Sequence, residues 1–328
     1  MRLAERIGIV GLGHIGGSLA ASLGASCPVI AYDLESRSRT IARSSLAVEV
    51  VESLGELVKM ADTFVVATPT PSVAQTIEEI DRLSCALGIF PLVIDVASVK
   101  HPFTGLSSHL GNARYLGMHP MAGREGSGVD SADGSLFANS RWAICLSGGE
   151  DDSDVASGAA VAFAAGASVL IGMSAEVHDQ VVALTSNLPH ALAFALAKSM
   201  LDSPVFPQAR WMVGGSFRDG TRVARSNPER VAEMLEPNGI ELGKQLDRFI
   251  GYLGDLQDAI MRRDCAGWLA AAEAGTFAAA DSPLATSAVL VKSGSLASQI
   301  LSLGESGVAV ADILEIPGTG FELRIATP

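Results

Sequence analysis

The sequence has little basic charge, few cysteines and no long apolar run. Its 328 residues carry a formal net charge of −13, and an acidic chain does not suit a nucleic-acid backbone, which attracts basic faces. The charge also gives no sign of binding to an anionic membrane, and an anionic substrate would need a local basic pocket. We therefore expect neither nucleic acid nor membrane as a partner.

Cysteine is scarce, with only Cys27, Cys85, Cys145 and Cys265. Their spacing matches neither a zinc motif nor a redox pair, so no metal site is expected. So few thiols are typical of a reduced cytoplasmic protein. The N-terminus lacks the apolar stretch of a signal peptide, and no run reaches the roughly 18 apolar residues of a membrane span. We therefore expect a cytoplasmic location.

Hydrophobic residues are plentiful, at 48% of the chain, and a chain this long usually forms about two domains of 100–200 residues each. In residues 1–172, short apolar runs alternate with helical stretches, which is typical of a parallel sheet covered on both faces. The expected strands are residues 7–10, 28–32, 63–67, 92–95 and 142–146. This region is predicted to be an α/β domain.

Helical periodicity replaces the strands after Gly172. Apolar residues recur at steps of three and four from Ile240 to Ile260, which predicts a long helix whose apolar surface meets a second subunit. We expect residues 173–281 to form an all-α domain that binds substrate and makes a homodimer. Residues 282–328 predict a short β-α-β-β unit, with strands at 288–291, 308–314 and 321–325 and a helix at 295–303.

A glycine-rich turn follows the first expected strand and opens a helix, which is the context of a dinucleotide-binding turn. Gly11 permits the tight turn, Gly13 lets the backbone approach the pyrophosphate, and Gly16 allows close packing of helix on strand. His14 and Ile15 lie where the free N–H groups and the positive end of the helix dipole favour phosphates. The turn predicts a Rossmann-type domain that binds a nicotinamide dinucleotide.

The second and third strands end in further candidate cofactor residues. Asp33 lies about twenty residues after the turn, where an acid binds the ribose 2′-hydroxyl of NAD. Its charge would repel the 2′-phosphate of NADP, although Arg37 and Arg39 just beyond it would soften that rule, so NAD is expected and NADP stays open. Thr68 and Pro69 either border the nicotinamide, at the sheet edge that faces the ligand, or form a plain rigid loop.

Three later segments carry candidate chemistry. Ser98 and Lys100 follow the strand at 92–95 and so lie at the rim of the crevice. His119 lies in a loop dense in glycine, and histidine is the natural base near neutral pH. A lone loop histidine is often structural, but an alcohol dehydrogenase needs a base for the departing proton. Arg222 has the planar fork that suits a carboxylate, or else it pairs with an acid at the surface.

A polar stripe opens the helical region. Asp179, Ser186 and His190 are spaced by seven and four positions, so on one helix they share a face, with Asn187 beside them. Pro189 is expected to kink this helix. Such a stripe is either the solvated face of the helix or, because apolar residues flank it, part of a buried site.

In this order, the segments resemble the prephenate and arogenate dehydrogenase family of tyrosine biosynthesis, over roughly residues 5–280. The most specific piece is the run 119–128, and the runs 188–190 and 217–222 support it independently. The resemblance implies an oxidative decarboxylation with a nicotinamide cofactor. Hydride leaves the ring carbon that bears the hydroxyl, the hydroxyl proton goes to a base, carbon dioxide departs, and the ring becomes aromatic.

The resemblance also implies a role for each central candidate. His119 would be the catalytic base at the hydroxyl, and Ser98 would orient that hydroxyl or the histidine. His190 would contact the substrate near its ring, and Arg222 would hold a substrate carboxylate. With the cofactor bound by the glycine turn, these roles imply an NAD-dependent prephenate dehydrogenase that forms 4-hydroxyphenylpyruvate, with an arogenate dehydrogenase that forms tyrosine directly as the alternative.

Four further residues surround the pocket in this comparison. Glu125 and Asp179 would pair with basic groups at the pocket mouth and regulate access. Asn187 stands where some relatives have histidine, and Arg124 is larger and more charged than the residue often found there. Arg124 would add a cation for a dianionic substrate. These departures leave both prephenate and arogenate open as the substrate.

The last unit resembles a shortened ACT regulatory module, which implies either a remnant that packs on the dimer or a unit that senses an amino acid. Two rival functions fit the whole chain less well. A non-catalytic dinucleotide sensor would keep the glycine turn without a convergent base and anion site. A 6-phosphogluconate- or hydroxyisobutyrate-type dehydrogenase would need a lysine early in the helical region, and residues 173–190 contain none.

Overall fold

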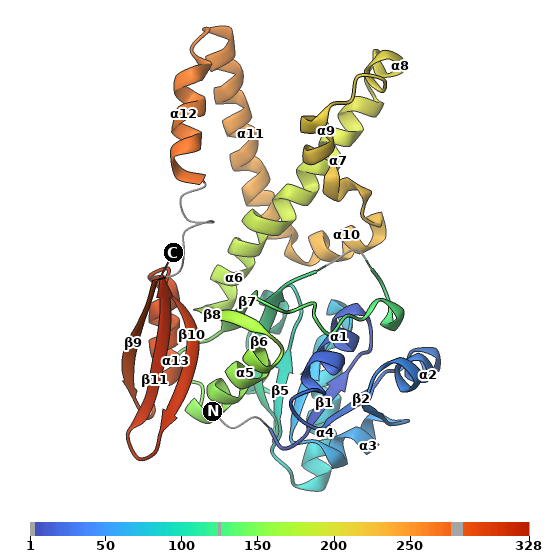
Figure 1. Cartoon of the computed structure of the whole chain (residues 1–328), viewed down its shortest axis with the longest axis vertical. Coiled ribbons are helices and arrows are strands. Elements are labelled where there is room, and N and C mark those ends of the chain that lie inside the picture. The colour runs from blue at the N-terminus through green and yellow to red at the C-terminus, as the bar shows by residue number, and fades with distance from the viewer. Residues whose placement is uncertain (1–3, 124–125, 277–284, 328) are drawn as a thin grey trace. The chain divides into compact units, whose positions relative to one another are not determined.

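The computed structural model describes residues 4–123, 126–276 and 285–327. Two predicted site residues, Arg124 and Glu125, lie outside these ranges. The chain divides into two compact units, Met1–His178 together with Pro283–Pro328, and Asp179–Ser282 (Figure 1). The three-domain division expected from the sequence, with boundaries at 172 and 281, stays a prediction.

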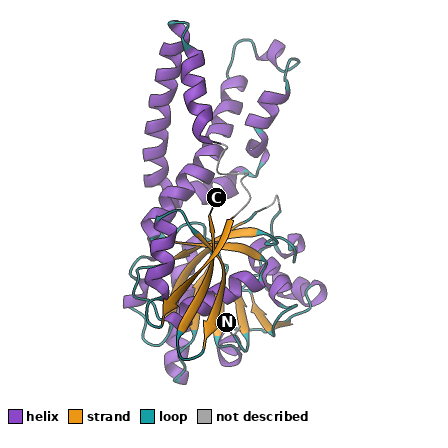
Figure 2. Ribbon diagram, turned by 60° about the vertical axis from the view of Figure 1, so that its left-hand side comes forward, coloured by secondary structure: helices purple, strands orange, loops and turns teal. Residues whose placement is uncertain are grey.

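Within the described part of the first unit, eleven strands form one sheet in the order β3-β2-β1-β4-β5-β6-β7-β8-β10-β11-β9. Figure 2 shows these strands in orange. The strands are β1 (Ile7–Val10), β2 (Val29–Tyr32), β3 (Glu49–Val50), β4 (Thr63–Val66), β5 (Leu92–Asp95), β6 (Arg114–Met121), β7 (Ser140–Cys145), β8 (Ala167–Met173), β9 (Ala285–Lys292), β10 (Ala309–Ile316) and β11 (Gly320–Thr327). From β3 to β6 all neighbours are parallel, and the order 3-2-1-4-5-6 is that of a dinucleotide-binding Rossmann fold. The predicted Rossmann-type domain is confirmed.

Helices cover both faces of this sheet. They are α1 (His14–Leu23), α2 (Ser36–Ser45), α3 (Leu54–Met60), α4 (Thr70–Leu87), α5 (Asp152–Ala164) and α13 (Leu296–Glu305). Alternate strand residues enter opposite cores, because Ile9 packs with Leu19 of α1 on one face, whereas Val10 packs with Ile77 of α4 on the other. Burial on both faces explains why the parallel strands read as continuous apolar runs.

The placement of His119 in a glycine-rich loop was wrong, because His119 lies in β6, opposite Ala143 of β7. Gly117 and Pro120 hide this strand from a reading of the sequence, since both residues are uncommon in strand interiors. Strand β5 pairs with β6 only as far as Gly117. Pro120 therefore has a strand neighbour on one side only, where its missing N–H is tolerated.

The C-terminal segment has the expected β-α-β-β order, as β9, α13, β10 and β11. Strand β10 pairs with β8 at Val310 and Leu170, which joins the segment to the Rossmann sheet. Helix α13 packs closely on β8, because a Cβ added at Gly304 would lie 1.7 Å from the carbonyl oxygen of Gly172. The likeness to an ACT module stays a prediction.

The second unit is helical, as expected. Its elements are the end of α6 (Ala175–Val182), then α7 (Leu188–Leu201), α8 (Phe206–Ala209), α9 (Gly215–Gly220), α10 (Pro228–Leu235), α11 (Gly239–Met261) and α12 (Cys265–Thr276). Helix α11 is the long helix expected from the spacing of Ile240 to Ile260. Ala175–Leu201 forms one continuous helical stretch that is long and apolar enough to cross a membrane by length and composition alone.

A π-helical turn, Ala183–Asn187, lies between α6 and α7. Pro189 stands in the first turn of α7, where a missing N–H is least costly. A π-helical turn has more residues than an α-turn, so it changes which side chains align. Asp179 and Asn187 are buried, whereas Ser186 and His190 are only partly so, and the expected single stripe is therefore divided.

Candidate active site

The glycine turn after β1 has the geometry that a dinucleotide requires. Gly11 has φ of +95°, a conformation that side chains disfavour. A Cβ added at Gly16 would lie 1.8 Å from the carbonyl oxygen of Gly11, whereas one added at Gly13 would meet nothing within 4 Å. Gly16 thus holds the helix against the strand, and Gly13 leaves open space beside the helix terminus.

The start of α1 offers unused polar groups. No side chain caps its first turn, so its N–H groups remain available to an anion. His14 is buried, and its Nδ1 lies 2.9 Å from the carbonyl oxygen of Ser131. Within the described residues, His14 Nε2 and Thr68 Oγ1 are buried without a hydrogen-bond partner. Ile15 is half-buried and Pro69 is exposed. These groups fit the phosphates and ring amide of a dinucleotide.

Asp33 follows β2 and is bound to the glycine turn. Its carboxylate accepts hydrogen bonds from the backbone N–H groups of Leu12, at 2.6 Å, and Glu35, at 2.8 Å. Arg39, which would favour a 2′-phosphate, donates to Glu52 at 3.1 Å and to the Asp33 carbonyl at 2.8 Å. The arginine is therefore already engaged beside the acid.

A buried ion pair supports the turn after β5. Lys100 and Asp95 are 2% and 0% exposed, and the ammonium of Lys100 donates to the Asp95 carboxylate. That carboxylate also accepts from the hydroxyl of Tyr115 at 2.7 Å and from the N–H of Ala97 at 2.9 Å. Lys100 is buried rather than at the rim, and the half-buried Ser98 lies within a turn that this pair holds in shape.

His119 stands near the end of β6 and contacts a second histidine. Its Nδ1 lies 3.0 Å from Nε2 of His178 in α6, and the two rings meet edge to face at 66°. Loss of solvation lowers the pKa of His119 well below 6.5, and the neighbouring His178 and Lys100 lower it further. His119 is therefore a neutral imidazole at neutral pH, which is the form that accepts a proton.

The polar residues of the helical unit form their own network. Asn238 lies just before α11, and its amide donates to the carbonyl oxygen of Asp179 at 2.9 Å and to Oδ1 of Asn187 at 2.8 Å. Among the described residues, Nδ2 of Asn187 is buried without a partner. His190 Nδ1 donates to the carbonyl oxygen of Ser186 at 2.8 Å, which leaves its Nε2 for another group.

The structure brings together only some of the predicted residues. Ser98 and His119 belong to the first unit, near the buried pair Asp95 and Lys100. Asp179, Asn187, His190 and Arg222 belong to the second unit, where Arg222 is exposed. That the two sets converge on one substrate stays a prediction.

Sequence reasoning gave no role to His178, which is 1% exposed and is the partner of His119. Its position beside Asp179 in the polar stripe was the available signal. The pairing itself depends on a contact between residues 59 positions apart, which no local pattern encodes.

Comparison with known proteins places both parts of the chain. Residues 19–171 match the family model "Prephenate dehydrogenase, nucleotide-binding domain", and residues 174–271 match "Prephenate dehydrogenase, dimerization domain". A cyclohexadienyl dehydrogenase of Zymomonas mobilis is 32% identical over 277 residues, which cover 80% of this chain and 91% of the relative. A prephenate dehydrogenase of Bacillus subtilis is 28% identical over 271 residues, which cover 80% and 72%.

Two solved structures agree with these matches. The Synechocystis arogenate dehydrogenase has a TM-score of 0.72 at 27% identity, with 82% of this chain and 98% of that chain covered. The prephenate dehydrogenase from A. aeolicus, in complex with hydroxyphenyl propionate and NAD+, has a TM-score of 0.70 at 27% identity, with 82% and 96% covered. The likeness therefore spans both units.

Proposed function

We propose, on the premise that the chain belongs to the prephenate dehydrogenase family of NAD-dependent oxidoreductases, that it converts prephenate to 4-hydroxyphenylpyruvate in tyrosine biosynthesis. The observation that carries the proposal is a neutral His119 at the end of a strand in the same sheet as the dinucleotide turn. Arogenate, which bears an amino group where prephenate has a keto group, is the second candidate, because the relatives include enzymes named for each substrate.

The chemistry divides between proton transfer and charge recognition. His119 accepts the proton of the ring hydroxyl, and Ser98 orients that hydroxyl. A dinucleotide held by the glycine turn and Asp33 would supply the hydride acceptor for the ring carbon that bears the hydroxyl, and loss of carbon dioxide from the substrate leaves the ring aromatic. His190 contacts the ring and Arg222 binds a substrate carboxylate, which an acidic chain needs for an anionic substrate. Positioning and a neutral base are the main requirements.

The remaining predicted residues surround this chemistry. In this proposal Asp179 pairs with a basic group at the pocket mouth and Asn187 lies toward the substrate side chain, while the roles expected for Glu125 and Arg124 fall outside the described residues. The buried Nδ2 of Asn187 supports a hydrogen-bond donor at that position, because a buried amide without a partner is costly unless a ligand accepts its hydrogen bond.

The residues after β2 favour NAD over NADP. Asp33 places a carboxylate where the 2′-phosphate of NADP would lie. Arg39 is held by Glu52 and by the Asp33 carbonyl, so it is not free to neutralise that phosphate. NADP therefore serves as the comparison cofactor in any assay.

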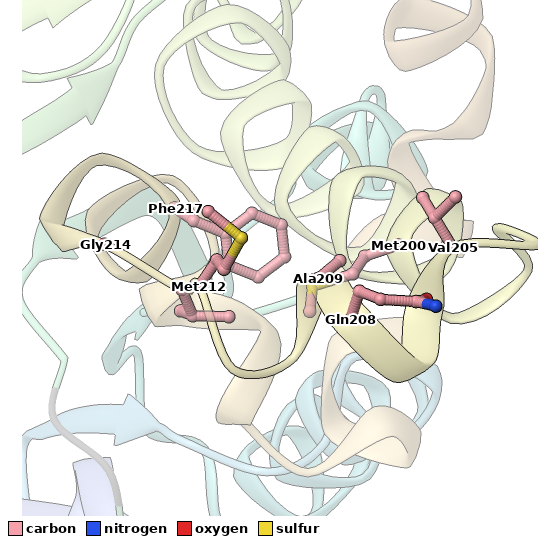
Figure 3. Close-up of a pocket in the computed structure, with 8 residues that line it drawn as sticks. Met200, Val205, Gln208, Ala209, Met212, Gly214 and Phe217 are labelled. Carbon is pink, nitrogen blue, oxygen red and sulfur yellow. The ribbon is translucent and has the colours of Figure 1, made fainter.

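The helical unit supports a homodimer. Trp211 and Met212 are 79% and 84% exposed. Met212 also lines an apolar pocket of about 500 Å³, together with residues that include Met200 and Phe217 (Figure 3). Exposed apolar side chains that lie together in this way favour a contact with another protein chain. We propose that a second copy covers it, in a cytoplasmic enzyme.

The test is turnover by the purified protein with prephenate and with arogenate, each with NAD and with NADP. The formation of reduced cofactor is the quantity measured. Product with neither substrate between pH 6 and pH 9 would contradict the proposal. His119→Asn should lower kcat by about 10²–10⁴-fold while NAD binding, measured by calorimetry, is unchanged. His109→Asn changes an exposed histidine of the same unit and is the matched control with full turnover.

A further inference from the structure

Among the described residues, the side chain that contacts Nδ1 of the proposed base, His119, is an imidazole and not a carboxylate. Both rings are held by regular structure. His119 belongs to β6, which pairs with β7. His178 lies in the first turns of α6, where its backbone N–H donates to the carbonyl oxygen of Ser174. The hydroxyl of Ser174 accepts from the backbone N–H of Val177. The 3.0 Å contact between the two rings is thus set by the fold.

Two nitrogens at this distance share one proton, and its position decides what His119 can do. If His178 donated to Nδ1 of His119, a neutral His119 would carry its own proton on Nε2 and could not accept another there. If His119 donates from Nδ1, its Nε2 keeps a lone pair. Only the second arrangement leaves a base at the nitrogen that faces away from His178.

We propose that His178 is a positioning residue whose Nε2 accepts the Nδ1–H of His119, so that Nε2 of His119 is the atom that takes the substrate proton. This rests on the proposed function, because it refines the role of its base. A third group, such as the aspartate of a Ser-His-Asp triad, is the usual way to fix a catalytic histidine tautomer. Here a buried imidazole, 1% exposed, takes that place.

The use of an imidazole in place of a carboxylate has a consequence for the pKa of His119. A carboxylate beside His119 would favour its protonated form and raise its pKa. The neighbouring His178 and Lys100 lower the pKa of His119 instead, and the carboxylate of Asp95 is bound to Lys100. His178 therefore orients His119 without stabilising its cation, and the base stays unprotonated at lower pH.

The resting protein alone tests the tautomer. We would label histidine with ¹⁵N, record spectra at pH 8, and assign His119 by the signals lost in His119→Asn. The proposal expects a proton on Nδ1 of His119 in the native protein and in His178→Gln, whose amide oxygen also accepts. His178→Leu, which has no acceptor, should shift His119 toward the Nε2–H form. An Nε2–H form in the native protein would overturn the proposal.

Kinetics supply the second test. His178→Leu should lower kcat at least tenfold with little change in KM, and His178→Gln should recover part of that loss, since it restores the acceptor. Equal losses of kcat in both variants would reduce His178 to packing and overturn the proposal.

Different outcomes would contradict the proposed function and the positioning role of His178. If the native protein turned over neither substrate but showed the Nδ1–H tautomer, the proposed function would be wrong and the positioning role of His178 would stand. Thermal unfolding of each variant identifies any loss of kcat that comes from a loss of folded protein.

Discussion

At the scale of single residues, Gly13 and Gly16 of the dinucleotide turn have different roles. Gly16 is required by the fold itself, since a side chain there would meet the carbonyl of Gly11. Gly13 is required only by a ligand, since the space beside it is open in the protein alone. Stability and cofactor binding should therefore respond differently at the two positions.

Gly16→Ala should lower the free energy of unfolding by about 1–3 kcal/mol, because the helix must move away from the strand. Gly13→Ala should leave the free energy of unfolding unchanged but weaken NAD binding at least tenfold, because its methyl group occupies the approach to the pyrophosphate. Urea unfolding without cofactor and calorimetry with NAD measure the two effects. Equal destabilisation by both substitutions would contradict this division.

At the scale of elements, the turn between β5 and β6 depends on a buried charge pair. Asp95 is 0% exposed and belongs to the last position of β5. Its carboxylate is shared among Lys100, Tyr115 and the backbone. Both charges lose solvation when they are buried, so the intact pair adds little to the free energy of unfolding. Removing only one partner is strongly destabilising, because the other charge is left buried and unpaired.

Lys100→Met should lower the free energy of unfolding by about 3–5 kcal/mol, because Asp95 is left buried without its cation. The control is Lys198→Met, which breaks an exposed pair with Asp202 at 2.9 Å and should cost less than about 1 kcal/mol. Urea denaturation of both variants is the measurement. A Lys100→Met protein as stable as the control would show that the pair does not hold this turn.

At the scale of the whole molecule, the long helix α11 presents apolar side chains to solvent. Ile250 and Leu253 are 63% and 49% exposed and stand one turn apart, where helix neighbours meet. Ile260 is also exposed, at 54%. A free protein rarely leaves such a patch uncovered, and the family model names this region a dimerization domain.

The double substitution Ile250→Glu and Leu253→Glu should shift the sedimentation coefficient from dimer to monomer, because it places charges in the apolar contact. Arg248→Glu, at an exposed position on the opposite face of the same helix, should leave the dimer intact. If the double variant sediments as the native protein does, another surface makes the dimer.

The sequence by itself determined the features that depend on neighbours in the chain. Apolar runs specified β1, β2, β4 and β5, the spacing of glycines specified the dinucleotide turn, and a three- and four-residue period specified α11. The β-α-β-β order of the last segment followed in the same way. Each of these patterns reports the burial of a strand or helix face, which is a local property.

Only the tertiary structure decided which distant groups meet. It made a strand of the segment with Gly117 and Pro120, because β7 supplies the pairing that local propensity does not. It buried Lys100 against Asp95, joined β10 to β8, and set His178 against His119. These contacts depend on the folding of separate elements onto one another, so no window of sequence contains them. The proposed base, His119, was visible in the sequence, and the imidazole that contacts it was not.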